Sequence, residues 1–225
     1  MLSRSQKVIS IVMKCAIAVS VAAGILLCFN GVAQGGFMAG KSLFLYFTIQ
    51  SNIAIALVCL AGIPALLCGK VSRGWAAVKL MFTVAITLTG CVFCFMLAPT
   101  LSYSAWTPAN ILTHVLVPIL SVADYFFVAR ELPLKRPDFL FSAIPPIFYV
   151  IFAAIGFVKN WDFGNGQNYP YFFLNWGSPA GAFGFMDRLP FLGSVWWILI
   201  LAVFVLGVGY LYTAAAMKIR KKNMS

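Results

Sequence analysis

The chain of 225 residues contains one histidine, His114, and this residue lies in a segment otherwise apolar enough to cross a lipid bilayer. Histidine is the side chain whose unperturbed charge changes near neutral pH. In hydrocarbon it is costly unless other groups of the protein bind its ring nitrogens. The segment from Asn110 to Asp124 is therefore the first place to expect a functional site.

A second group of polar residues lies in another apolar segment, at a matching depth. Thr48, Ser51 and Asn52 fall within about 100° of arc on a helical wheel, whereas Gln50 points elsewhere. Thr48 lies six residues after Ser42, and His114 lies seven after Thr107, the predicted starts of their spans. At 1.5 Å per residue, Thr48 and His114 are both expected roughly 10 Å below the same membrane boundary.

A hydroxyl and an imidazole that face each other can perform nucleophilic acyl transfer. A threonine hydroxyl is a weak nucleophile until a base removes its proton, and a neutral imidazole within hydrogen-bond reach is the commonest such base. We therefore predict Thr48 as the nucleophile and His114 as the general base. The residues that would orient the ring or bind an oxyanion are Ser51, Asn52, Asn110 and Ser121.

Each of these residues also has a structural interpretation. Thr48 can hydrogen-bond to the carbonyl group of Phe44, as serine and threonine do in transmembrane helices. Thr107-Pro108 is typical of a helix N-terminus, which would give Asn110 a role in completing the first turn. His114 can form an interhelical hydrogen bond that only holds the bundle together.

Asp124 lies ten residues deeper than His114, about 15 Å along a helix axis, and is too far to complete a catalytic triad. Lys14 and Lys79 lie at a similar depth near the other membrane boundary. A charge in hydrocarbon needs a partner. We predict an interhelical ion pair between Asp124 and one of these lysines, closer than about 6 Å.

The elements that position these residues are predicted to be membrane-spanning helices. Apolar residues make up 62% of the chain and charged residues 9%, compared with about a quarter charged in soluble domains. Hydropathy predicts an all-α integral membrane protein, a single domain of six spans without an internal repeat, at about residues 8–32, 42–68, 75–98, 107–129, 139–158 and 191–217. The first apolar run is too long for a secretory signal, so we expect it to remain as a helix.

The charge distribution predicts the topology. The net charge is +11, and with the N-terminus in the cytoplasm 13 of the 16 lysines and arginines lie on the inner side, all but Lys41, Lys159 and Arg188. The positive-inside rule then places both termini in the cytoplasm and indicates a multi-pass protein of the cell membrane. This distribution is that of a membrane topology rather than of a protein that binds nucleic acid.

The segment from Lys159 to Pro190 is the longest predicted connection, with nine aromatic and five glycine residues. Its aromatic content favours packing at the membrane interface, as an interfacial segment or a lid. Pro145-Pro146 should kink the fifth span. Thr83, Thr87, Gly90 and Cys94 give the third span a small-residue face for close helix packing.

The six cysteines all fall within or at the ends of apolar segments. Cys91 and Cys94 have CxxC spacing, but a zinc or redox motif requires an accessible turn. We expect them to be packing residues, and we predict neither a metal nor a cofactor.

Three motifs in order along the chain carry a family resemblance. These are Tyr46-Phe-Thr48-Ile-Gln-Ser-Asn52, then Asn110-x-x-x-His114-x-x-x-Pro118 leading to Asp124, then Asn168-Tyr-Pro-Tyr-Phe-Phe-Leu-Asn175. Together they resemble the androgen-induced protein family and its bacterial relatives. That family also includes the androgen-dependent TFPI-regulating protein. The resemblance implies an integral membrane hydrolase that cleaves fatty acid esters of hydroxy fatty acids, with Thr48 and His114 in the two catalytic roles.

The expected function is thus hydrolysis of a lipid ester in the membrane, with a fatty-acyl ester and membrane lipids as partners. The alternative is a non-catalytic membrane protein that binds lipid or transports a small solute through the same polar pocket. Covalent chemistry separates the two, because a binding protein forms no acyl-enzyme. The oligomeric state does not follow from the sequence.

Overall fold

The computed structural model describes residues 2–30, 40–101, 104–164 and 166–223. These residues form helices and turns without a β-strand; two isolated bridges, Gly164 with Gln167 and Phe185 with Leu192, lie in the long connection before the last helix. Six helical segments are long and apolar enough to cross a membrane. The prediction of an all-α membrane protein with six spans is confirmed at this level.

Three spans are single α-helices: α1 (Arg4–Phe29), α2 (Phe47–Cys68) and α7 (Ser194–Lys222). The third span is α3 (Arg73–Val92), extended by a π-helical turn, η2 (Phe93–Leu97), and a 3₁₀ turn, η3 (Ala98–Thr100).

The fourth and fifth spans change helix type along their length. The fourth consists of α4 (Pro108–Ile111), the π-helical turn η4 (Leu112–Leu116) and α5 (Val117–Phe127). The fifth begins as a 3₁₀-helix, η6 (Arg136–Ala143), and continues as α6 (Ile144–Val158). Three short 3₁₀ turns, η1 (Gly40–Leu45), η5 (Ala129–Glu131) and η7 (Phe172–Leu174), lie in the connections.

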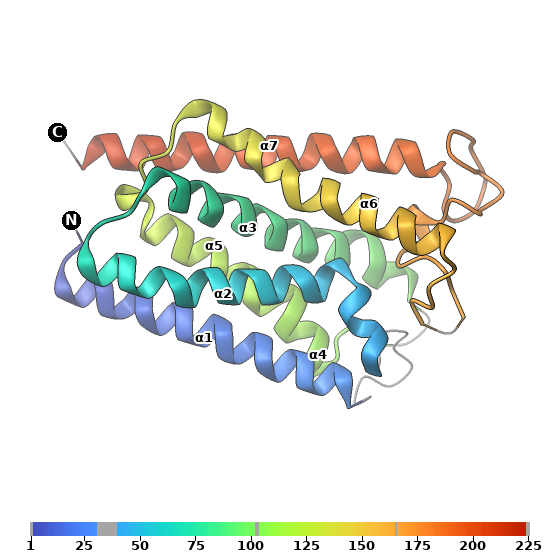
Figure 1. Cartoon of the computed structure of the whole chain (residues 1–225), viewed down its shortest axis with the longest axis horizontal. Coiled ribbons are helices and arrows are strands. Elements are labelled where there is room, and N and C mark those ends of the chain that lie inside the picture. The colour runs from blue at the N-terminus through green and yellow to red at the C-terminus, as the bar shows by residue number, and fades with distance from the viewer. Residues whose placement is uncertain (1, 31–39, 102–103, 165, 224–225) are drawn as a thin grey trace.

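The spans form a bundle with α3 at its centre. α3 packs against α2 and α5 on one side and against η6 and α7 on the other, while α1 contacts α2, α4 and α5. Both termini lie at one end of the bundle, which we call the terminal end, and residues 159–164 and 166–193 lie at the other, the loop end (Figure 1). α1 is therefore part of the packed bundle.

Several helix starts follow the capping signals in the sequence. The Ser72 side chain accepts from the Trp75 N–H, and the Thr107 side chain accepts from the Asn110 N–H. Pro108 occupies the first turn after Thr107, as predicted from the N-cap pattern. At Pro145-Pro146, where we predicted a kink, the fifth span changes from 3₁₀- to α-helix, and the prolines stand in the first turn of α6.

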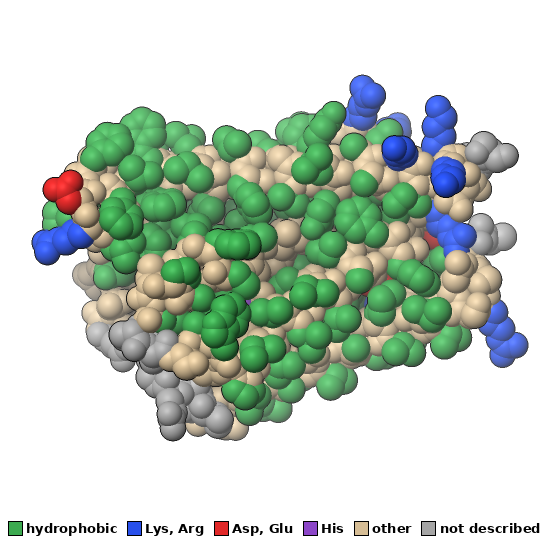
Figure 2. Space-filling model, turned by 180° about the vertical axis from the view of Figure 1, so that it is seen from behind, with side chains coloured by type: hydrophobic (Ala, Val, Ile, Leu, Met, Phe, Trp, Pro, Cys, Tyr) green, Lys and Arg blue, Asp and Glu red, His purple; other side chains and the backbone are tan. Residues whose placement is uncertain are grey.

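The sides of the bundle are apolar and its charges lie at the ends. Exposed side chains along the spans include Val19, Leu57, Phe148 and Val203. Lysine and arginine side chains gather at the terminal end, and hydrophobic side chains cover the surface between the two ends (Figure 2). This distribution suits a surface that faces lipid.

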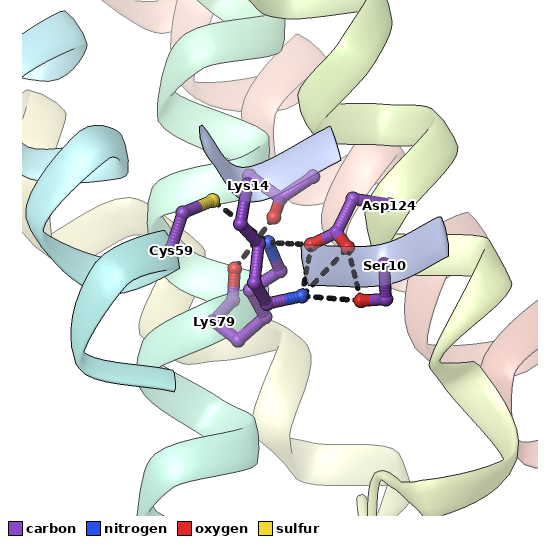
Figure 3. Close-up of polar contacts among 6 residues, drawn as sticks. Ser10, Lys14, Cys59, Lys79 and Asp124 are labelled. Carbon is purple, nitrogen blue, oxygen red and sulfur yellow. Dashed lines mark hydrogen bonds and ion pairs between the residues drawn. The ribbon is translucent and has the colours of Figure 1, made fainter. Parts of the chain in front are cut away.

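Asp124 of α5 joins three helices near the terminal end (Figure 3). Its carboxylate accepts from Lys14 Nζ of α1 at 2.6 Å and from Lys79 Nζ of α3 at 2.7 Å. Ser10 Oγ donates to the same carboxylate at 2.8 Å, and the Lys79 Nζ–Cys59 Sγ distance is 3.4 Å. The predicted ion pair is confirmed, and both candidate lysines take part in it.

Removal of the Asp124 charge should destabilise the bundle. Asp124→Asn leaves two buried ammonium groups without a counter-ion, and breaking a buried pair in this way costs about 3–5 kcal/mol. We expect a clear fall in the Tm of the purified protein in detergent. Asp187→Asn, which changes an exposed acid at the loop end, is the control. Equal Tm values for the two variants would contradict a structural role for Asp124.

Candidate functional site

An apolar cavity of about 390 Å³ lies between α2, α3, α6 and α7. Its walls are mainly aliphatic and aromatic side chains, among them Phe47 of α2, Val150 of α6 and Leu201 of α7. The few polar side chains in the lining include Thr48 and Tyr171. A largely apolar cavity of this size with a few polar groups is typical of a small-molecule site.

Thr48 lies in the first turn of α2, where backbone N–H groups have no partner within the helix. Its N–H donates to the Tyr171 hydroxyl oxygen at 3.4 Å, and the two hydroxyl oxygens are 3.5 Å apart. The Phe44 carbonyl, the alternative partner for Thr48, accepts from Gln50 Nε2 at 3.1 Å. Among the described residues, the Thr48 side chain thus has its hydrogen-bond contact with Tyr171 at the cavity wall.

Tyr171 reaches this position because residues 159–164 and 166–193 are packed tightly onto the bundle. Its ring stacks on Phe173 with centroids 5.0 Å apart and meets Tyr46 edge-on. The Tyr46 hydroxyl donates to the Phe163 carbonyl at 2.6 Å, which fastens α2 to the same segment. Burial raises the pKa of the Tyr171 phenol, so the group is a neutral hydrogen-bond donor at physiological pH.

His114 lies in the π-helical turn η4, beside the other π-helical turn, η2. Its ring stacks on Phe93, the first residue of η2, with centroids 3.9 Å apart. Nδ1 lies 3.2 Å from the Asn110 carbonyl oxygen and 3.0 Å from Thr113 Oγ1. π-helical turns occur frequently at functional sites.

These contacts select one tautomer of the His114 ring. The Asn110 carbonyl only accepts, and the Thr113 hydroxyl donates its own hydrogen to the Ala109 carbonyl at 2.9 Å. Both contacts therefore require the hydrogen on Nδ1. Nε2 then keeps a free lone pair and is the basic atom of the ring.

The turns that carry Thr48 and His114 are neighbours, as the depth count predicted. Asn52 Nδ2 donates to the Thr48 carbonyl at 2.7 Å and to the Thr113 carbonyl at 3.1 Å, which links α2 to η4. No hydrogen bond joins Thr48 Oγ1 to the His114 ring among the described residues. The structure thus brings the two helices together without direct contact between the two functional groups.

All six predicted site residues are buried, but Thr48 is the one of the six that lines the cavity; His114 and the four accessory residues do not. Ser51 Oγ donates to the Thr48 carbonyl at 3.0 Å and lies 2.7 Å from Thr89 Oγ1. Asn110 Nδ2 donates to the Ala105 carbonyl, which fits the structural interpretation of a helix start. Ser121 Oγ and Asn52 Oδ1 are buried without a hydrogen-bond partner among the described residues.

Tyr171 is the residue of the cavity wall that the sequence analysis missed. The aromatic run from Asn168 to Asn175 marked its surroundings, but nothing in the run distinguishes Tyr171 from Tyr169. Its position depends on contacts with Tyr46 and Tyr149, which are distant in sequence.

Comparison of the chain with protein-family models, with curated proteins and with solved structures finds no match. The resemblance to the androgen-induced protein family therefore stays a prediction. The function is therefore inferred from the geometry of the cavity and of the two neighbouring turns.

The turn that carries His114 should be sensitive to the size of residue 90. A Cβ atom at Gly90 would lie 2.9 Å from the His114 carbonyl oxygen, whereas a Cβ at Gly207 of α7 has no neighbour within 4 Å. Alanine in a helix interior is intrinsically favoured over glycine by about 1 kcal/mol. We expect Gly207→Ala to keep or raise the Tm and Gly90→Ala to lower it. A higher Tm for Gly90→Ala would contradict the close packing of α3 on η4.

Proposed function

We propose that this protein is an intramembrane hydrolase of lipid esters, with Thr48 as nucleophile and His114 as general base. One observation carries the proposal: the Thr48 side chain, in the first turn of a helix, lines a largely apolar cavity of about 390 Å³. A lipid ester combines an apolar chain with one reactive polar group. The cavity offers apolar walls for such a chain and, at Thr48 and Tyr171, polar groups for the ester.

The reaction would proceed in two steps. Thr48 Oγ1 forms a bond to the ester carbonyl carbon while its proton passes to Nε2 of His114, and the alcohol leaves with that proton. A water then attacks the acyl-threonine, releases the fatty acid and restores the hydroxyl. The chemistry needs no metal or cofactor.

The first step requires Nε2 of His114 to come within hydrogen-bond reach of Thr48 Oγ1, directly or through one water. Catalytic hydrogen bonds often tighten only when substrate is bound. The link through Asn52 keeps the two turns adjacent, which supports the proposal that the two groups meet when substrate is bound.

The proposal includes the orientation in the cell membrane. The concentration of lysine and arginine at the terminal end supports a cytoplasmic location for both termini. Thr48 and Tyr171 would then lie near the outer leaflet, and membrane lipids would be the source of substrate.

A non-catalytic lipid-binding protein is the second candidate. Two observations favour it. His114 is not among the residues that line the cavity, and in the described part of the chain no hydrogen bond joins the His114 ring to Thr48. Solute transport has less support. Leu88 and Val205 of the cavity wall belong to a buried apolar core with Leu80, Val84 and Tyr125, which lies toward the terminal end.

Covalent labelling with a fluorophosphonate probe tests the hydrolase proposal. We expect the probe to label the natural protein and not Thr48→Ala. His114→Gln should lower the labelling rate roughly 10²- to 10⁴-fold, the usual contribution of a general base.

The control for labelling is Thr89→Val, which removes the hydroxyl of another cavity residue and should label normally. Normal labelling of Thr48→Ala would overturn the nucleophile assignment. Absence of labelling and of fatty acid release in the natural protein would favour the lipid-binding candidate.

A further inference from the structure

The cavity is closed toward the loop end. Tyr171, Phe173 and Leu174 line it there and are all buried. Their segment is fastened by the hydrogen bond from Tyr46 to the Phe163 carbonyl and by another, 2.8 Å long, from Trp197 Nε1 to the Pro190 carbonyl. A ligand from the aqueous phase at this end would have to displace a packed aromatic cluster.

The cavity is also closed toward the terminal end. Leu88 and Val205 line it and pack into the apolar core around Leu80 and Val84, all of which are buried. Beside them, α7 lies against η6 so closely that a Cβ atom at Gly209 would be 2.6 Å from Ser142 Oγ. A third direction of entry into the cavity is lateral, between α6 and α7, two of the helices that line it.

α6 and α7 separate beyond this contact. α7 packs against η6 and α3, and α6 diverges from it toward the loop end (Figure 1). Two residues of α6, Ile147 and Ile151, line the cavity and are 56% and 52% exposed on the apolar side of the bundle. Ala202 of α7 lines the same cavity and is half-buried. The same side chains thus belong to the cavity wall and to the surface that faces lipid.

The polar end of the cavity offers two hydrogen-bond donors. These are the Tyr171 hydroxyl and the Thr48 N–H, which lies at the positive end of the α2 dipole. The Tyr171 hydroxyl oxygen lies 3.4 Å from the Thr48 nitrogen and 3.5 Å from Thr48 Oγ1, and both distances are at the long limit of hydrogen bonds. An oxygen acceptor on a ligand would make shorter bonds to both donors.

The volume limits the ligand to one chain. A cavity of about 390 Å³ is at the small end of the range of ligand pockets, which suits one apolar chain better than two. We propose that the gap between α6 and α7 is a side entrance from the bilayer. Through it the cavity takes the chain of a single-chain amphiphile, whose polar oxygen accepts from the Tyr171 hydroxyl.

This inference rests on the proposed function for the identity of the ligand as the acyl part of the substrate. Binding of the ligand nevertheless needs no turnover, so binding and hydrolysis can be measured separately. A long-chain fatty acid that carries a diazirine and an alkyne is a suitable probe because it contains no ester bond. It is added to the full-length protein in lipid nanodiscs, crosslinked by light, and quantified through the alkyne with unlabelled fatty acid as competitor.

We expect saturable crosslinking to peptides of α6 and α7 in the natural protein. Ala202→Trp and Ile147→Trp, which fill the entrance from its two sides, should each weaken binding roughly tenfold, because added bulk in a filled cavity is costly. Phe148→Trp is the matched control: it neighbours Ile147, is 69% exposed and does not line the cavity, so its binding should equal that of the natural protein.

Two further measurements test the pose. Tyr171→Phe removes one hydroxyl and should weaken binding about two- to tenfold, the contribution of one hydrogen bond. Competing fatty acids should gain up to about fourfold in affinity per added methylene until the cavity is full. Full-strength binding by Tyr171→Phe would overturn the role of the Tyr171 hydroxyl.

Unchanged binding in both entrance variants, or crosslinking that never saturates, would overturn the side entrance. Each variant is compared only after its Tm confirms that it folds. Ala202→Trp and Ile147→Trp change different helices, so the test does not depend on the folding of one variant. Saturable binding without fluorophosphonate labelling would refute the hydrolase and leave this site intact. Fluorophosphonate labelling without saturable fatty acid binding would refute this binding site and leave the hydrolase proposal intact.

Discussion

The carboxylate of Asp124 holds α1, α3 and α5 together in a region where no water solvates the charges. Two lysines and a serine from two other helices converge on it, and all are buried. Replacing one partner alone would leave a charge in hydrocarbon, so the pairing fixes how these helices face one another. The fourth span continues from this anchor to η4, and the position of His114 therefore depends on the same contact.

The candidate site is built from the close packing that this anchor makes possible. A Cβ atom at Gly24 would lie 2.6 Å from Thr113 Cγ2, and one at Gly90 would lie 2.9 Å from the His114 carbonyl oxygen, so α1 and α3 hold η4 from two sides. Asn52 then ties η4 to the turn of α2 that carries Thr48. The turns that carry the two proposed catalytic residues are thus positioned by backbone contacts of their neighbours.

The sequence predicts the features that the cost of polar groups in a membrane dictates. The six spans, the Asp124 pair and the buried face of Thr48, Ser51 and Asn52 follow from hydropathy and helical period. The direction of His114 does not, because the π-helical turn η4 departs from the 100° per residue that relates Asn110, His114 and Ser121 on an α-helix. Tyr171 lies in a segment without periodicity, and its place is set by aromatic contacts with residues far away in the chain.

The central claim is that the Thr48 hydroxyl reacts at the polar end of an apolar cavity. Peptide mass spectrometry of the natural protein after reaction with a fluorophosphonate tests it most directly, because it locates the adduct on one residue. The account predicts an adduct on Thr48. An adduct confined to another hydroxyl, such as Ser51 or Thr89, would contradict it.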